Sequence, residues 1–250
     1  MTSPEAALQV LHDAAAAAAD ALRDLQDWGP SGGRSDQYHS DVLADAAVLE
    51  VLDRAGFGVF SEESGLHHPD RPVRVVVDPV DGSTNASRGL PWWATSLCAL
   101  DEDGPAAAVV VNQVTGWRFE ATRGGGARRD GRAVAPTGCS SLSSAIVAFS
   151  GYPRHYLGWS QYRSLGAAAL DICAVAAGTL DAFIDCAPSS LAPWDYLAAM
   201  LICQEAGASV VDAEGRDLVV REGTGRRTVV AAATPALLAE AVAGRRRLDG

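Results

Sequence analysis

The chain lacks lysine completely: all 20 basic residues among its 250 are arginine. Against 31 acidic residues this leaves a formal net charge of -11 at pH 7. Proteins that bind nucleic acid nonspecifically, or anionic membranes, need a basic surface that attracts phosphates. The charge balance therefore excludes nucleic acid and membranes as partners, and taken alone it also argues against a phosphorylated ligand.

Paired cysteines and long apolar runs are missing as well. The five cysteines are scattered, odd in number and never spaced as C-x-x-C, so neither a disulfide framework nor a thiolate zinc site is expected. No apolar run approaches the roughly 20 residues of a membrane span. The N-terminal segment is alanine-rich with scattered acids, unlike a signal or transit peptide. These absences predict reduced thiols and a cytoplasmic location.

Hydrophobic residues make up 48% of the chain, which is enough for a substantial core. Apolar positions recur at helical spacing between residues 4 and 27 and again from Ser40 to Gly56, so two helices precede any strand. Short β-branched runs then predict a meandering, mostly antiparallel sheet. These runs cover residues 73–77, 95–100, 107–111 and 117–122.

Beyond about residue 140, strands and helices alternate. Strands are predicted at 145–149, 182–185 and near 209 and 229, and helices at 166–177, 195–206 and 236–243. The fold class is therefore α+β, with an N-terminal helix pair, a mostly antiparallel sheet and a C-terminal mixed α/β part. We expect residues 1–140 and 141–250 to be two parts of one compact unit.

The most informative segment is D-P-V-D-G-S-T-N, which begins at Asp78 directly after an apolar strand. It places Asp78 and Asp81 three residues apart on a turn fixed by Pro79, and Gly82 permits a tight bend before residues suited to a helix N-cap. Such carboxylates can share a divalent cation, and the N–H groups of a following helix can hold a phosphate oxygen. An acidic turn that merely caps a helix fits this segment equally well.

Two further acidic elements favour the metal site. Glu62 and Glu63 follow a short strand, and Asp195 lies at the start of the helix predicted at 195–206. Together S-E-E-S, D-P-V-D-G-S-T-N and W-D-Y-L-A-A-M-L-I-C-Q-E-A-G-A, in this order, resemble the inositol monophosphatase family of magnesium-dependent, lithium-sensitive phosphomonoesterases. The resemblance continues through R-S-L-G-A-A-A and A-G-T-L-D-A and covers nearly the whole chain. It implies a layered αβαβα sandwich.

The resemblance also implies a metal-ligand set. Glu62, Asp78 and the carbonyl of Val80 would hold a first magnesium ion, and Asp78, Asp81 and Asp195 a second. Glu62 would contribute to a third site through water, so two to three ions are expected per active site. The implied chemistry is in-line attack by an activated water, without a phosphoenzyme. Two ions add four positive charges, so an acidic protein without lysine can still bind phosphate.

Further roles follow from the same resemblance. Ser83 stands where the family has a threonine that orients the water, and Asp41 matches the aspartate linked to it. Asp185 is a shorter stand-in for a glutamate that contacts substrate hydroxyls, and residues 186–193 form a longer stretch than in animal relatives. The implied substrate contacts are Asp81, Gly82, Ser83, Gly166, Ala167, Ala168, Asp185 and Asp195.

Inositol 1-phosphate is the leading substrate hypothesis. Fructose 1,6-bisphosphate is the main alternative, because L-D-A-F-I-D also resembles microbial enzymes that hydrolyse both. Relatives acting on histidinol phosphate or adenosine 3',5'-bisphosphate usually carry D-G-T-K, where this chain has D-G-S-T. A noncatalytic, partner-binding role is the alternative from another class. A small phosphorylated metabolite and a second copy of the chain are the expected partners.

Other conspicuous residues have plainer interpretations. Glu63 is expected to support the structure rather than bind metal, and His67 and His68 to lie in a solvated loop. The arginine-rich stretch 122–132 is typical of a charged hairpin tip, since it lacks the G-K-[ST] ending of a phosphate loop. Trp92 and Trp93 are expected to make buried contacts. Residues 244–247 are expected to form a solvated tail.

Overall fold

The computed structural model describes residues 2–34, 37–220 and 225–248. The α-helices there are α1 (Pro4–Leu22), α2 (His39–Arg54), α3 (Ser83–Ser87), α4 (Ala168–Ala176), α5 (Pro193–Ala206) and α6 (Pro235–Arg246), with a 3-10 turn, η1, at Leu142–Ser144. The first strands are β1 (Gly58–Ser61), β2 (Gly65–His67), β3 (Arg74–Asp81), β4 (Ala94–Asp101), β5 (Gly104–Asn112), β6 (Arg118–Thr122), β7 (Gly126–Arg129) and β8 (Arg132–Ala133). The later strands are β9 (Ile146–Ser150), β10 (Gln161–Arg163), β11 (Ala182–Asp185), β12 (Ser209–Asp212) and β13 (Val229–Ala232).

The described strands form two sheets. The first has the order β2-β1-β3-β4-β5-β6-β7-β8 and is antiparallel except where β1 runs parallel to β3. The second has the order β10-β9-β11-β13-β12 and mixes both directions. The predicted antiparallel N-terminal sheet and mixed C-terminal part are therefore confirmed.

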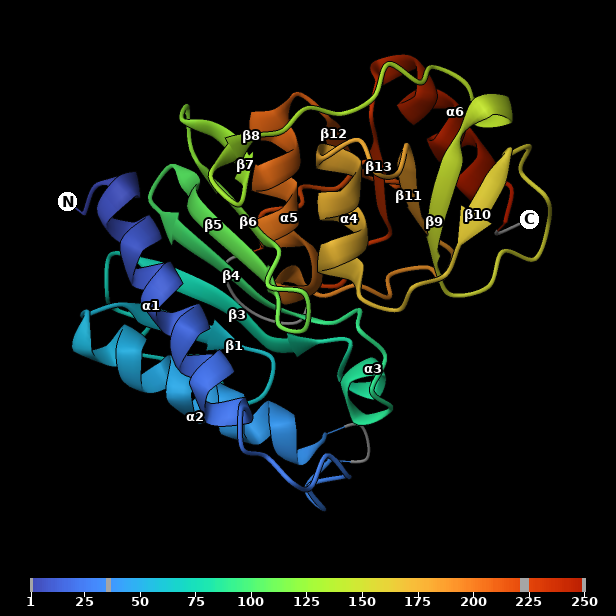
Figure 1. The fold of residues 1–250 in the computed structure, drawn as a ribbon. Helices are drawn as coiled ribbons and strands as arrows, with labels where there is room; N and C mark the ends of the chain where they lie inside the picture. The colour runs from blue at the N-terminus through green and yellow to red at the C-terminus, as the bar shows by residue number, and fades with distance from the viewer. Residues whose placement is uncertain (1, 35–36, 221–224, 249–250) are drawn as a thin grey trace.

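Figure 1 shows how the layers stack. Helices α1 and α2 cover one face of the first sheet, α4 and α5 lie between the two sheets, and α6 covers the outer face of the second. Along β3, Val75 and Val77 pack toward α1 and α2, whereas Val76 faces the layer of α4 and α5, as the alternation of a strand requires. The αβαβα sandwich is confirmed. The predicted boundary at residue 140 falls between β8 and η1 and remains a prediction.

The helix ends follow local chemistry. Ser3 caps α1 and Thr234 caps α6, each accepting a hydrogen bond from a backbone N–H of the first turn, and each is followed by a proline at the first helical position. Helix α2 begins at His39, one residue earlier than predicted, because Asp41 accepts from the backbone N–H of Tyr38. In the described residues, no helix has the length and apolarity needed to cross a membrane.

The sequence predicts that Asp78 and Asp81 lie on a turn that follows the strand, and this prediction is wrong. Strand β3 runs through Asp81, and its pairing with β4 shifts register between Asp78 and Asp81. At this bulge the hydroxyl of Thr95 donates to the carbonyl of Pro79 at 2.9 Å. A bulge accommodates Pro79, which has no N–H for the ladder, and it re-aims the neighbouring side chains.

Two plainer predictions are also corrected. His67 lies on the short strand β2 rather than in a loop, since residues 65–67 pair with β1. Residues 244–247 are not a solvated tail: Arg245 is completely buried, and its Nε donates to the backbone carbonyl of Asp185 at 2.5 Å. The last turn of α6 therefore packs against the end of β11, with a cation at the helix C-terminus where the dipole favours it.

Candidate active site

The parallel pairing of β1 and β3 brings the first two carboxylates together. Ser61 is the register partner of Val77, and the backbone N–H of Glu62 donates to the carbonyl of Val77 at 3.0 Å. Glu62 follows the last residue of β1, and Asp78 is the residue after Val77 on β3. Their proximity is therefore fixed by the main chain before any side chain is considered.

The third carboxylate comes from the layer between the sheets. Asp195 lies in the first turn of α5, where its Oδ2 accepts from the backbone N–H of Ala192 at 2.6 Å. One carboxylate oxygen from each of Glu62, Asp78 and Asp195 lies within 4.8 Å of the others. Three oxygen ligands at this separation suit a hard divalent cation, which would offset their mutual repulsion.

Asp81 sits beside this group and contacts helix α4. Its Oδ2 accepts from the N–H of Ala169 at 2.7 Å and its Oδ1 from that of Ala168 at 3.1 Å. The negative charge of Asp81 nevertheless contributes to the raised pKa of Asp195. The carboxylate thus joins the N-terminus of α4 to the acidic group, and its role as a metal ligand remains a prediction.

Burial and crowding shift the pKa of every carboxyl in the group. Burial, reinforced by the charge of Asp195, raises the pKa of Glu62 to about 8. Burial likewise raises the pKa of Asp81 to about 8 and that of Asp195 to about 7, and it holds the pKa of Asp78 well above its ordinary value. Such groups take up protons near neutral pH when no cation is present, and a bound cation favours their ionised forms. The donor set therefore fits a metal.

Asp78 and Val80 are held together locally. The backbone N–H of Val80 donates to Oδ1 of Asp78 at 3.0 Å, and both side chains are buried. This leaves the other oxygen of Asp78 for a cation. The predicted role of the Val80 carbonyl as a ligand remains a prediction.

Asp41 and Ser83 come from different elements. Asp41 is buried near the start of α2, accepts from Tyr38 N–H at 2.8 Å and from the Ser40 hydroxyl at 3.2 Å, and its charge raises the pKa of Glu62. Burial raises the pKa of Asp41 itself to about 6. Ser83 begins α3 directly after Gly82. Within the described residues no hydrogen bond joins Asp41 to Ser83, so their predicted linkage remains a prediction.

The segment leading into α4 packs directly on the bend at Gly82. Gly82 has φ +88°, and a Cβ there would lie 3.1 Å from both the Ala167 Cβ and the Gly166 carbonyl oxygen. The structure thus places Gly166 and Ala167, two of the implied substrate contacts, beside the D-G-S segment. The N–H of Ala168 is already bonded to Asp81, so its predicted contact with substrate remains a prediction.

Asp185 is completely buried at the end of β11. Both its carboxylate oxygens accept from the Ser190 hydroxyl at 2.7 Å, and Oδ1 also accepts from the N–H of Ala187 at 3.1 Å. Its charge still raises the pKa of Asp195. Asp185 therefore shapes the segment 186–192, and a direct contact with substrate remains a prediction.

The side chain of Glu63 makes its contacts outside the group formed by Glu62, Asp78 and Asp195. Its Oε2 binds Arg34 at 2.8 Å and Gln37 at 2.5 Å, and Arg34 also donates to the backbone carbonyl of Glu62 at 3.1 Å. The interpretation of Glu63 as a structural residue is consistent with this.

Sequence reasoning missed two arginines near the carboxylates. The charge of Arg34 lowers the pKa of Glu62, and that of Arg226 lowers the pKa of Asp195. Arg226 donates to the backbone carbonyl of Ser190. Neither arginine belongs to a recognisable sequence motif, so no pattern could have selected them.

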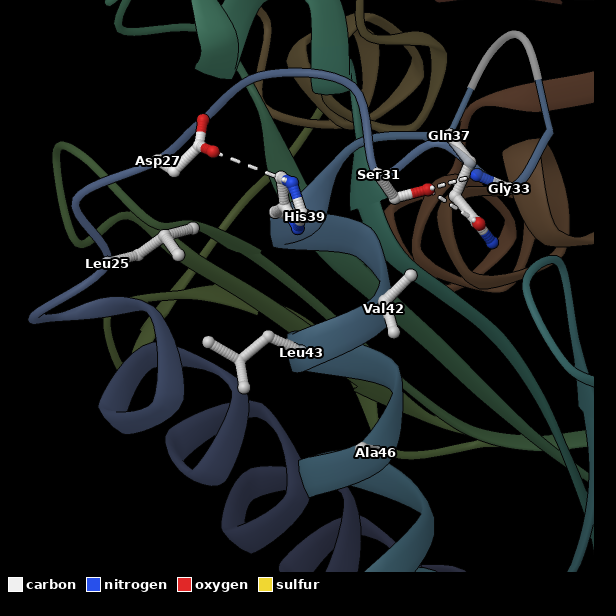
Figure 2. Close-up of a pocket in the computed structure, with 9 residues that line it drawn as sticks. All are labelled: Leu25, Asp27, Ser31, Gly33, Gln37, His39, Val42, Leu43 and Ala46. Atoms are coloured by element: carbon white, nitrogen blue, oxygen red, sulfur yellow. Dashed lines mark hydrogen bonds and ion pairs between the residues drawn. The ribbon is translucent and has the colours of Figure 1, made fainter.

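A separate groove lies along α2 (Figure 2). It has a volume of about 530 Å³ and is lined by loop residues 25–33 and by one face of α2, including His39, Val42 and Leu43. Asp41 lies on the opposite face of the helix, because successive residues are rotated by about 100°. The groove is therefore not part of the carboxylate site.

Comparison with known proteins agrees with this geometry. The sequence profile of the inositol monophosphatase family matches residues 36–248. The chain is 32% identical over 201 residues to the fructose-1,6-bisphosphatase of Pyrococcus furiosus, covering 79% of each chain. It is 32% identical over 193 residues to the Nus factor SuhB of Escherichia coli K12, covering 70% of this chain and 71% of the relative.

A solved structure shows the same fold. The extragenic suppressor protein suhB of Bartonella henselae superposes with a TM-score of 0.82 at 27% identity, over 96% of this chain and 99% of that one. The chain belongs to the inositol monophosphatase family, whose members include phosphatases, and the resemblance inferred from the motifs is confirmed. The relatives carry different functional names, so they leave the substrate open.

Proposed function

We propose that the protein is a magnesium-dependent phosphomonoesterase that acts on a small phosphorylated polyol, with inositol 1-phosphate as the first candidate. The observation that carries the proposal is the meeting of Glu62, Asp78 and Asp195 within 4.8 Å. One buried and two partly exposed carboxylates this close repel one another when ionised, and a bound cation would offset that repulsion. Family membership supports the assignment to phosphatases.

Glu62, Asp78, the Val80 carbonyl, Asp81 and Asp195 would hold two to three magnesium ions. When bound, magnesium lowers the pKa of water and offsets the charge of a phosphoryl group. The raised pKa values of Glu62 and Asp195 favour this assignment, because burial and then neighbouring carboxylates disfavour their ionised forms and a bound cation would oppose both effects. Lithium sensitivity and a homodimer are part of the same proposal.

The other site residues would orient the reactants. The hydroxyl of Ser83 and the carboxylate of Asp41 would align the attacking water, with Glu62 as the adjacent base. The first N–H groups of a helix have no acceptor within the helix, so those of Ser83 and Thr84 can donate to phosphate oxygens. Gly82, with φ +88°, allows the tight bend of the backbone directly before these N–H groups. Asp185 would position the substrate hydroxyls through the segment 186–192, which its hydrogen bonds hold in place.

Fructose 1,6-bisphosphate is the second candidate substrate. A relative with 32% identity carries the name fructose-1,6-bisphosphatase, and the same carboxylate group would serve either phosphate ester. A noncatalytic role is a weaker alternative, although another relative is named a Nus factor. A protein that only binds partners has no need for three carboxylates placed this close together.

The test is a phosphate-release screen with purified protein and Mg²⁺ or EDTA. Its substrates are inositol 1-phosphate, fructose 1,6-bisphosphate, histidinol phosphate and adenosine 3',5'-bisphosphate. We expect magnesium-dependent release, fastest from inositol 1-phosphate. Preference for another substrate would correct the proposed specificity, and no release from any substrate, with Mg²⁺ bound, would favour the noncatalytic role.

A further inference from the structure

A hydrogen-bonded cluster away from the metal-binding carboxylates joins the N-terminal motif to the start of α4. Asn85, in α3, donates from Nδ2 to the carbonyl oxygens of Trp92 and Leu165, each at 2.7 Å. Only 9% of Asn85 is exposed. One amide thus ties α3 both to the loop that follows it and to a segment 80 positions further along the chain.

A second bond joins the loop of Trp92 to helix α4. Nε1 of Trp92 donates to Oδ1 of Asp171 at 2.8 Å, and Asp171 is 1% exposed on α4. Trp92 also packs edge-to-face against Trp117. The hydrogen bond between the indole and the buried carboxylate is directional. It therefore fixes the distance and the orientation of the Trp92 loop relative to α4.

These bonds surround the bend at Gly82. A Cβ on Gly82 would lie 3.3 Å from the Trp92 carbonyl oxygen, and one on Gly166 would lie 3.2 Å from Nδ2 of Asn85. A side chain at position 82 would therefore crowd the neighbouring backbone, and one at position 166 would crowd the side chain of Asn85. Immediately before this bend, Asp81 accepts from the N–H groups of Ala168 and Ala169.

We propose that Asn85, Trp92 and Asp171 are positioning residues that clamp α3 to the N-terminus of α4, and so fix Asp81 and Ser83 for the reaction. They touch neither substrate nor cation and act through the bend at Gly82 and the first turn of α4. The proposal rests on the proposed phosphatase function. A misplacement of about 1 Å in such a site can lower the rate about a hundredfold.

The test compares Asn85→Ala, Trp92→Phe, Asp171→Ala and Asp171→Asn. The asparagine at 171 keeps an oxygen that can accept from Trp92, so it should rescue the function that alanine loses. We expect the first three variants to lower kcat about tenfold or more with KM changed less than about twofold. The double variant Trp92→Phe/Asp171→Ala should be no worse than either single one, because both remove one bond.

A second readout needs neither substrate nor metal. Hydrogen exchange of the Ala168 and Ala169 amides, followed by NMR, reports directly on their bonds to Asp81. We expect faster exchange at these two amides in Asn85→Ala, Trp92→Phe and Asp171→Ala, and near wild-type exchange in Asp171→Asn. Two matched controls remove similar groups elsewhere: Trp28→Phe, whose indole donates to Leu25, and Asp181→Ala, whose carboxylate accepts from Thr137.

The outcomes separate the two proposals. If the variants melt at lower temperature but keep wild-type exchange at Ala168 and Ala169, or behave like the controls, the three residues are only structural and the clamp is rejected. If the wild-type protein releases no phosphate, the proposed function fails, whereas the exchange pattern still decides whether the clamp holds Asp81.

Discussion

The buried guanidinium of Arg245 donates a hydrogen bond to the backbone carbonyl of Asp185 across 60 positions of sequence. Burial raises the pKa of Asp185 to about 6, and the charge of Arg245 opposes that rise. One arginine in the last turn of α6 thus holds the end of β11, where the segment 186–192 that leads to α5 and Asp195 begins.

Replacing Arg245 by alanine should destabilise the protein strongly. The change leaves a cavity and an unpaired buried carbonyl, and we expect a loss of about 3 kcal/mol in the free energy of unfolding. Urea unfolding measures it. Arg247→Ala, on an exposed residue of the same segment, is the control and should change stability little. Equal losses in both variants would mean that burial at 245 has no special importance.

Asp195→Asn should abolish phosphate release while the protein remains folded. The asparagine oxygen can still accept from the N–H of Ala192, so the start of α5 keeps its cap. Without metal, the variant should melt no lower than wild type, because one repelling charge is gone. Thermal melts with and without Mg²⁺ check this: the ion should stabilise wild type but not the variant. Normal turnover would contradict the metal assignment.

Asp81→Asn should also abolish release, but it should be less stable than Asp195→Asn. Asp81 accepts from two N–H groups, and an amide has one oxygen for them and directs an NH₂ group at the other. We expect a loss of about 1–2 kcal/mol, as for a helix cap. Urea unfolding of both variants in EDTA compares them. A stability equal to that of Asp195→Asn would argue against this capping role.

The metal-free protein should become less stable as pH rises from about 4.5 to about 8. Folding raises the pKa of Glu62 from 4.5 to about 8 and that of Asp195 from 3.8 to about 7, so the folded state binds more protons in this window. Stability is therefore full below the unfolded pKa values and is lost as pH passes the folded ones. Melting temperatures in EDTA test the slope. A rise over this range would contradict it.

Magnesium should reverse this trend. The ion binds the ionised carboxylates, so its apparent affinity should increase with pH over the same interval. Isothermal titration with MgCl₂ at pH 6 and pH 8 measures the difference, and proton release should accompany binding. Equal affinity at both values would mean that the raised carboxyls do not contribute to the site.

Gly82→Ala should impair both stability and activity. Residue 82 has φ +88°, and the added Cβ would lie 3.1 Å from Ala167. Gly89 is a matched control, with φ +71° and no atom within 4 Å of an added Cβ. Gly89→Ala should cost about 1 kcal/mol from backbone strain alone, and Gly82→Ala clearly more. Urea unfolding and phosphate release measure both, and similar losses would show that crowding at Gly82 is unimportant.

Local patterns predicted most elements and the acidic residues of the site. Glu62, Asp78 and Asp195 follow or begin strongly patterned segments, and the family resemblance of those segments singled them out as candidate ligands. The bulge at Asp78 and Asp81 was missed, because valine-rich strand and proline turn signals conflict there. Contacts such as Trp92 to Asp171 and Arg245 to Asp185 were also missed, since they depend on packing between layers and leave no periodic trace.

The layer order has a consequence for how the site assembles. Glu62 and Asp78 belong to the first sheet, whereas Asp195 is carried by α5, which packs between that sheet and the second one. A chain ending near residue 140 would keep the strand pair but lack the carboxylate that completes the cation site. Tight magnesium binding would therefore indicate that both sheets have folded and packed together. The ion would stabilise the complete fold rather than either part alone.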